Sequence, residues 1–420
     1  MKKFFAILLS LLMIAALVAC SANTQGTDDA AGANNGAAQA ETADNIDVQV
    51  PSDFKVGFIC LHDENSTYDL NFINAAKAAC EKLGITDYVI KTNIPEGKEC
   101  YDTAADMADS GCKIIFADSF GHEDFMIQAA REFPDVQFCH STGTKAHTEG
   151  LPNYHNAFAA IYEGRYLAGI AAGMKLNEMI ADGKITADQC KIGYVGAFTY
   201  AEVVSGYTSF FLGVRSVCPS VTMDVIFTGS WYDEKAEKES ALKLIDGGCV
   251  LISQHADSMG APSACESAGV PNVSYNGSTI SVGPNTYIIS SRINWEPYYE
   301  YAIKAAAAGK AIPADWTGTI ATDSVQLIDL NTAVAADGTQ EAIDAAIAAM
   351  KAGTLHVFDT KNFQVEGKNL DSYMADVNSD ADFTPDTEVI IDGYFHESEF
   401  RSAPYFDIQI DGITLLNKSF

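Results

Sequence analysis

The side chains that could do chemistry form none of the common catalytic motifs. The sequence has no GxSxG nucleophile elbow, no Walker A loop, no GxGxxG loop opening a helix and no HExxH zinc motif. Three of its eight histidines, His140, His147 and His155, are spaced too far apart to bind one metal ion from a single helix face. We interpret these histidines as structural and expect the protein not to be an enzyme.

One acidic run comes close to a calcium-binding loop. Asp and Asn alternate with other residues from Asp376 to Asp382, and Glu388 follows. An EF-hand loop needs Gly at its sixth position for a sharp turn and Glu at its twelfth for bidentate binding. Ala381 and Thr387 occupy those positions here. We therefore expect an acidic surface loop, and neither a metal ion nor a cofactor.

The ten cysteines give no metal motif either, because no CxxC pair and no zinc-type Cys/His spacing occurs. Cys20 stands apart near the N-terminus. It leaves an odd number of others, at Cys60, Cys80, Cys100, Cys112, Cys139, Cys190, Cys218, Cys249 and Cys265. We interpret these as free, mostly buried thiols, and a disulfide framework is the alternative.

The N-terminus has the form of a lipoprotein signal. Lys2 and Lys3 give it a positive start, and the apolar run from Phe4 to Ala19 suits a signal core but is short for a membrane span. Cys20 follows small residues directly, as in the lipobox of bacterial lipoproteins. We expect residues 1–19 to be a signal peptide and Cys20 to carry the lipid that anchors the protein to the outer face of the cell membrane. An ordinary signal peptide with an incidental cysteine is the alternative.

Composition and charge narrow the class of protein. The 420 residues include 26 basic and 56 acidic side chains, giving a formal net charge of −30, and 48% are apolar. The acidic excess argues against nucleic-acid binding and against adsorption to an anionic lipid surface, since both need basic patches. The apolar content is ample for globular cores. Residues 20–52 have almost no large apolar side chain before Ile46, so we interpret them as the lipidated cysteine and a flexible tether.

Buried strands alternate with helices from Phe54 onward. Apolar runs typical of parallel strands occur at 55–60, 113–117, 136–140, 191–195, 221–227, 250–253, 271–275 and 287–290. Helical periodicity lies between them, at about 70–83, 101–110, 122–133, 157–179, 203–217, 234–246 and 261–268. This alternation predicts α/β sheets in two lobes, 53–180 and 181–295, with residues 296–420 returning to complete both. We expect a ligand in the crevice outside the carboxyl ends of the strands.

Seven phrases, in order, resemble the "basic membrane protein" family of ABC-transporter solute-binding lipoproteins. They are His62 to Asp69, Asp118 to Gly121, Tyr162 to Gly169, Gly196 to Phe198, Gly229 to Asp233, Gln254 to Ser258 and Asn294 to Tyr299. The best-understood members of this family are purine nucleoside receptors, and one branch takes free purine bases. The resemblance implies a periplasmic-binding-protein-like (type I) fold, whose two lobes of parallel sheets flanked by helices close on a small solute. The partners it implies are that solute and the ABC permease subunits, and we expect a monomer.

The resemblance also implies a ligand site of aromatic rings and polar side chains at strand ends. The implied residues are Tyr68, Asp69, Ser119, Phe120, Phe198, Trp231, His255, Asp257, Asn276 and Trp295. Tyr68 occupies the place of a stacking ring in the first lobe, and Trp295 matches a Trp of the nucleobase-binding branch. The structural alternative is that the rings pack between elements and that the two aspartates cap helices.

The chemistry of these residues suits a neutral planar solute. Aromatic stacking contributes roughly 1–3 kcal/mol per base, and a carboxylate can accept hydrogen bonds from ring N–H or amino groups. Nucleoside-binding members use a Lys where Ile293 or Asn294 falls here, and an Asp where Asn276 falls. We therefore expect a purine nucleoside or a free purine base, and these departures favour the base. Another small neutral solute such as a sugar, or a surface nucleoside hydrolase, is the alternative.

Overall fold

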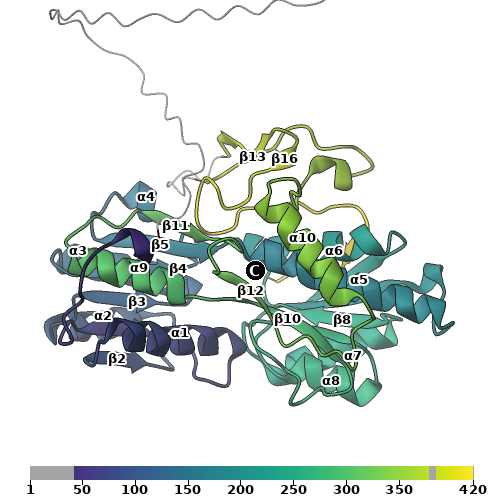
Figure 1. Ribbon diagram of the computed structural model, residues 1–420, viewed down its shortest axis with the longest axis horizontal. Helices are drawn as coiled ribbons and strands as arrows, with labels where there is room; N and C mark the ends of the chain where they lie inside the picture. The colour runs from purple at the N-terminus through teal and green to yellow at the C-terminus, as the bar shows by residue number, and fades with distance from the viewer. Residues whose placement is uncertain (1–41, 378–384, 420) are drawn as a thin grey trace, which may run out of the picture. The chain divides into compact units, whose positions relative to one another are not determined.

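The computed structural model describes residues 42–377 and 385–419 (Figure 1). The expected signal peptide, Cys20 and most of the expected tether therefore lie outside the described residues. The same is true of residues 378–384, the middle of the acidic run that resembles a calcium loop.

A six-stranded parallel sheet forms the first lobe, in the order β11-β5-β4-β3-β1-β2. Most of these strands are buried on both faces, because helices cover both sides of a parallel sheet, and β2 is the exposed edge. The strands are β1 Val56–Ile59, β2 Tyr88–Lys91, β3 Ile114–Ala117, β4 Gln137–Ser141, β5 Tyr154–Ala159 and β11 Asp315–Gly318. The helices are α1 Thr67–Leu83, α2 Lys98–Asp109, α3 Glu123–Glu132, α4 Ala146–Glu149 and α9 Glu296–Ala307.

A seven-stranded sheet forms the second lobe, in the order β12-β10-β9-β8-β6-β7-β17, and all its pairs are parallel except β10 with β12. The strands are β6 Lys191–Gly196, β7 Thr222–Phe227, β8 Leu251–Gln254, β9 Asn272–Tyr275, β10 Tyr287–Ile293, β12 Val325–Ile328 and β17 Ile413–Leu415. The helices are α5 Ile161–Ala181, α6 Ala201–Val217, α7 Glu234–Asp246 and α8 Gly260–Ala268, with α10 Thr339–Lys351 packed on α5. The α/β class and the parallel sheets flanked by helices are as predicted.

The change from the first lobe to the second comes earlier than the sequence suggested. The helical pattern expected at 157–179 is divided, because its first residues belong to β5 and the helix α5 begins at Ile161. Helix α5 packs against α6 and β10 of the second sheet, so the chain crosses at Ala160 and not near residue 180.

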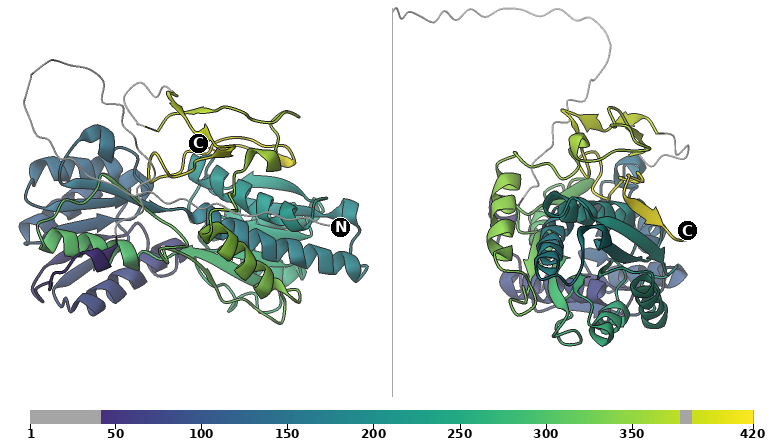
Figure 2. Two further views of the ribbon diagram at one scale, coloured as in Figure 1. Left: turned by 45° about the horizontal axis from the view of Figure 1, so that its top comes forward. Right: turned by 90° about the vertical axis from the view of Figure 1, so that its right-hand side faces the viewer.

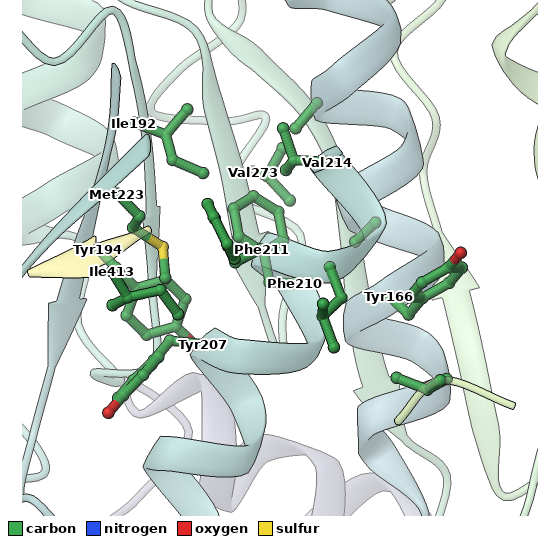
Figure 3. Packing of buried hydrophobic residues seen from close by; sticks show 14 of the residues in the cluster. Tyr166, Ile192, Tyr194, Tyr207, Phe210, Phe211, Val214, Met223, Val273 and Ile413 are labelled. Atoms are coloured by element: carbon green, nitrogen blue, oxygen red, sulfur yellow. The ribbon is translucent and has the colours of Figure 1, made fainter. Parts of the chain in front are cut away.

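Two glycines explain why α5 stays with the second lobe. A Cβ atom at Gly169 would lie 2.2 Å from the carbonyl oxygen of Phe210, and one at Gly213 would lie 2.0 Å from that of Tyr166. The two helices are therefore in backbone contact, which only glycine permits. Figure 3 shows the core beside this contact, where Phe210 and Phe211 of α6 lie among side chains of α5 and of the sheet.

The C-terminal part of the chain is tied to both lobes. It adds the short strands β13 Met374–Ala375, β14 Thr387–Glu388, β15 Ile390–Ile391 and β16 Tyr394–Phe395, which lie above the junction of the lobes in Figure 1. The main-chain N–H of Ser402 donates to Asp315 of β11 at 2.9 Å, which fixes this part to the first lobe. Strand β17 pairs with β7, which fixes it to the second (Figure 2). Residues 296–420 thus supply strands to both sheets.

The cysteines from Cys60 to Cys265 are free and buried in the described structure. No helix in the described ranges has both the length and the apolar character needed to cross a bilayer.

Candidate functional site

A pocket lies where the strand ends of the two lobes face each other, and it contains about 370 Å³ of space between atoms, including space open to solvent. The first lobe lines it with Leu61, His62, Tyr68, Ser119, Phe120 and Thr142, and the second lobe with Glu202, Trp231, His255, Asp257 and Tyr275.

Asp69 fixes the side of the pocket that the first lobe forms, which we call the first wall; the side that the second lobe forms is the second wall. Its Oδ1 accepts the main-chain N–H of His62 at 2.7 Å, and its Oδ2 accepts the Ser66 hydroxyl at 2.6 Å and lies 3.3 Å from His62 Nδ1. Burial alone would raise the pKa of Asp69, but these hydrogen bonds outweigh it and hold the pKa below its ordinary value. Ser66 caps α1 and accepts from the Asp69 N–H, so the start of the helix fixes the carboxylate that orients His62.

A second buried carboxyl, Asp118, lies beneath the same wall. Its Oδ1 accepts the Leu61 N–H at 3.0 Å, and its main-chain oxygen accepts the Tyr68 hydroxyl at 2.7 Å. Burial and the nearby Asp69 charge raise the pKa of Asp118 well above its ordinary value, so its neutral acid form is favoured. Ligand atoms of Cys60, Asp69 and Asp118 lie within 4.8 Å of one another. Burial also raises the pKa of the Cys60 thiol, so Cys60 and Asp118 favour their protonated forms and Asp69 is the ionised member of the cluster.

The second wall is organised around His255. Its ring lies 4.5 Å from the Tyr275 ring, its Nε2 is 3.4 Å from Glu202 Oε1, and its Nδ1 is 3.3 Å from the Tyr194 hydroxyl. Burial lowers the pKa of His255 although Glu202 acts in the opposite direction. The imidazole is therefore neutral at pH 7. The tautomer that suits the contact with Glu202 carries its proton on Nε2 and donates it to the carboxylate.

A buried arginine supports the second wall without lining the pocket. Arg165 of α5 is 0% exposed and donates to the Ser253 hydroxyl at 2.8 Å and to the Ser274 carbonyl at 3.2 Å. Its guanidinium also lies 5.0 Å from the Tyr275 ring. It thus joins the ends of β8 and β9, the strands that precede His255 and carry Tyr275.

The two lobes are in contact around the pocket. The Asp257 carbonyl accepts the main-chain N–H and the hydroxyl of Thr67, both at 3.1 Å. Asn71 donates to the Asn276 side chain at 3.2 Å. The ring of Phe120 stacks on that of Tyr200 with centroids 5.4 Å apart. These contacts join residues of different lobes, so the structure is a closed form.

Six of the ten predicted site residues line the pocket, namely Tyr68, Ser119, Phe120, Trp231, His255 and Asp257. Asp69 lies behind His62, and Asn276 is engaged in the lobe contact with Asn71. Phe198 packs on Tyr200 and Trp231, within the second lobe.

The structure corrects the placement of Trp295. This indole is 1% exposed and stacks on Phe72 of α1 with centroids 4.5 Å apart, inside the core of the first lobe. Trp295 is the residue that caps α9, and α9 packs along α1, so the indole faces that helix and not the strand ends.

Five lining residues were not predicted from the sequence: Leu61, His62, Thr142, Glu202 and Tyr275. The strand-end rule could have found Leu61, His62, Thr142 and Tyr275, because each lies at or just after the end of a strand. Glu202 lies in the first turn of α6 and carried no such signal.

Comparison with known proteins identifies the family. The family described as "ABC transporter substrate-binding protein PnrA-like" matches residues 61–354, more than half of the chain. The chain belongs to this family. Members are substrate-binding proteins of ABC transporters, which act outside the cytoplasm, bind small ligands and deliver them to a permease.

Two relatives and two solved structures are similar. A purine-binding protein of Brucella abortus is 35% identical over 261 residues, 61% of this chain and 69% of its own. A putative ABC transporter glucose-binding protein of Haloferax volcanii is 35% identical over 206 residues, 49% of each chain. Solute-binding proteins of Conexibacter woesei and Aeropyrum pernix share the fold, both with TM-score 0.60. Their identities are 20% and 15%, and the matches cover 72% and 78% of this chain and 97% and 95% of theirs.

Proposed function

We propose that the protein captures a purine between its two lobes and delivers it to the permease of an ABC importer. The observation that carries this proposal is the composition of the pocket lining. Four aromatic rings (Tyr68, Phe120, Trp231 and Tyr275) and two carboxyls (Glu202 and Asp257) line it, and none of its eleven lining residues is Lys or Arg.

These groups match the two recognition needs of a purine. The rings offer flat apolar faces on which a base can stack, worth roughly 1–3 kcal/mol per base. The carboxyl oxygens can accept hydrogen bonds from ring N–H and amino groups, and a ligand lacking such donors leaves them unpaired at a large cost in affinity. The 35% identity to a purine-binding protein supports the same ligand class.

The surroundings favour a free base over a nucleoside. Ile293 is 2% exposed in the core of the first lobe, and the Asn294 side chain donates to the Asp323 carbonyl at 3.1 Å. Asn276 is held by Asn71. Ile293 and Asn294 are therefore engaged elsewhere, and the Asn276 side-chain oxygen already accepts from Asn71.

Calorimetric titration of the protein with adenine, hypoxanthine, guanine, inosine, adenosine and guanosine tests this proposal. We expect the free bases to bind more tightly than the matching nucleosides. A ligand at a hundred times its Kd should also raise the free energy of unfolding by about 2.7 kcal/mol. Chromatography of each ligand after incubation is the control for hydrolysis, and recovery of free base from a nucleoside would overturn the binding-protein assignment.

A neutral sugar is the second candidate, because the relative from Haloferax volcanii is named a glucose-binding protein and sugar sites also combine aromatic rings with carboxylates. Glucose and pentoses belong in the same titration. Binding of a sugar with no response to any purine would replace the leading proposal by this one.

We further propose that Cys20 is lipidated and anchors the protein as a monomer at the membrane. The support is the apolar run that ends at this cysteine. The Cys20→Ser variant should appear in the soluble fraction while the unchanged protein stays with the membrane. Equal distribution of the two would refute the anchor, and light scattering of the soluble variant tests the monomer.

A further inference from the structure

A second, larger cavity lies on the C-terminal side of the lobe junction. It encloses about 1620 Å³ between atoms, including space open to solvent. Its walls come from β11 and the loop after it, from the first turn of α5, from residues 355–358 and from residues 394–402. The last of these lies beyond residue 354, where the family match ends, so this cavity depends on a part of the chain that the family model does not cover.

The walls of this cavity are fixed by hydrogen bonds between distant segments. The Thr317 hydroxyl donates to the Ser398 carbonyl at 3.2 Å, and the Tyr162 hydroxyl donates to the Glu397 carbonyl at 3.3 Å. The Ser402 hydroxyl donates to Asp315 Oδ1 at 2.7 Å. Strand β11, helix α5 and the C-terminal segment thus enclose the space together.

Two carboxyls in the walls have no cationic partner within 4 Å among the described residues. Glu163 accepts the Ile320 N–H at 2.7 Å. Glu397 is 1% exposed, its Oε2 accepts the Tyr405 N–H at 3.4 Å, and its Oε1 has no hydrogen-bond partner in the described structure. Burial raises the pKa of each to about 7, although the charge of Lys351 acts in the opposite direction at Glu163 and that of Arg401 at Glu397.

The other charged groups of the walls are already engaged. Asp315 accepts from Ser402 and lies 2.8 Å from His147, and Glu399 lies 2.7 Å from His396. The Arg401 guanidinium donates to the carbonyls of Ala403 and Pro404 at 3.2 and 3.0 Å. Glu163 and Glu397 are therefore the wall carboxyls that can still form an ionic contact, and each would form it with a positively charged group.

Aromatic rings complete the lining. Tyr162, Trp316, Phe358 and Tyr394 all face this space. Rings attract cations to their faces and also cover apolar chains, so rings with carboxylates suit a positively charged group on a carbon skeleton better than a bare metal ion. We propose that this cavity is a second ligand site, which takes a small organic cation of the aliphatic amine class.

Calorimetric titration of the full chain with putrescine and cadaverine tests the proposal, with the diols of the same length as neutral controls. We expect the amines to bind and the diols not to bind. Glu163→Gln and Glu397→Gln should each weaken amine binding at least about tenfold, the effect of removing one charge-assisted contact of about 1.4 kcal/mol. Glu341→Gln, on the exposed face of α10, is the matched control and should leave amine binding unchanged.

The result is separable from the function proposed for the first pocket. Asp257→Asn alters that pocket and should leave amine binding intact, and saturating purine should not displace the amine. Displacement by purine would show that the amine occupies the first pocket and would overturn the proposal. So would no amine binding at millimolar concentration, or amine binding that both glutamine variants retain. Thermal unfolding of each variant establishes that it is folded.

Discussion

Closure of the two lobes can be measured through a single aromatic pair. Phe120 lies at the end of the first lobe's sheet and stacks on Tyr200 of the second, with centroids 5.4 Å apart and planes inclined by 29°. The pair joins different lobes, so it exists only in the closed form. Its stabilising contribution should therefore appear as ligand affinity, because ligand binds to the closed form and open forms lack the contact.

The expected magnitude follows from the geometry. An offset-stacked pair contributes about 0.5–1.5 kcal/mol beyond the burial of its area, which corresponds to a factor of about 2 to 12 in affinity. Phe120 is 41% exposed, which favours the lower part of this range. Phe120 also lines the pocket whereas Tyr200 does not, so the loss in the Phe120→Ala variant mixes two effects.

A double-mutant cycle separates these effects. Ligand affinity is measured by calorimetry for the unchanged protein, Phe120→Ala, Tyr200→Ala and the double variant, and the coupling free energy isolates the ring pair. The matched control is the cycle of Phe198 and Tyr200, whose rings stack at 5.1 Å within one lobe. That pair is present whether the lobes are open or closed, so its coupling in ligand affinity should be near zero. Equal coupling in the two cycles would refute the closure argument.

Three further predictions concern particular side chains. Trp231→Phe should weaken ligand binding, measured by calorimetry, with little loss of stability. Trp295→Phe should instead lower the free energy of unfolding, measured by denaturant titration, by about 1–3 kcal/mol and leave ligand affinity unchanged. The opposite pattern would restore Trp295 to the site. Gly213→Ala should lower the free energy of unfolding by about 1–3 kcal/mol, because the new Cβ would lie 2.0 Å from the Tyr166 carbonyl oxygen, and denaturation that matches the unchanged protein would contradict the backbone contact. Burial raises the pKa of Glu163 from 4.5 to about 7 in the folded state. As pH rises from 4.5 to 7, the carboxyl ionises more readily in the unfolded chain, which lowers the free energy of unfolding of the unchanged protein. The stability of Glu163→Gln relative to the unchanged protein should therefore increase over this range. A constant difference between the two across that range would show that Glu163 titrates normally.

The fold could be predicted largely from the sequence because its strands are short runs buried on both faces. The errors arose where a strand and a helix follow each other without a polar break. A single residue separates β5, Tyr154–Ala159, from α5, and the helix predicted at 157–179 includes the last three residues of this strand. Assignment of α5 to a lobe depends on Gly169 and Gly213, which allow the backbones of α5 and α6 to touch. That contact can be recognised only once the two helices are placed together.

The site was predictable to the extent that it follows strand ends. Ser119, His255 and Asp257 each lie within about three residues of a strand end, and the pocket includes all three. The strand-end rule does not take helix packing into account. Such packing brings Glu202 into the pocket from α6 and turns Trp295 toward α1, although the latter also follows a strand closely.

Strand β17 has a consequence for the order in which the protein folds. The first lobe's sheet has all its strands once the chain reaches Gly318, at the end of β11. The second sheet needs Ile413 to pair with Met223, which precedes it by almost half the chain. Contacts between such distant residues form slowly, because a long loop must close first. During synthesis and export the first lobe can therefore assemble while the second still exposes the edge of β7, which leaves that edge open to aggregation before the chain is finished.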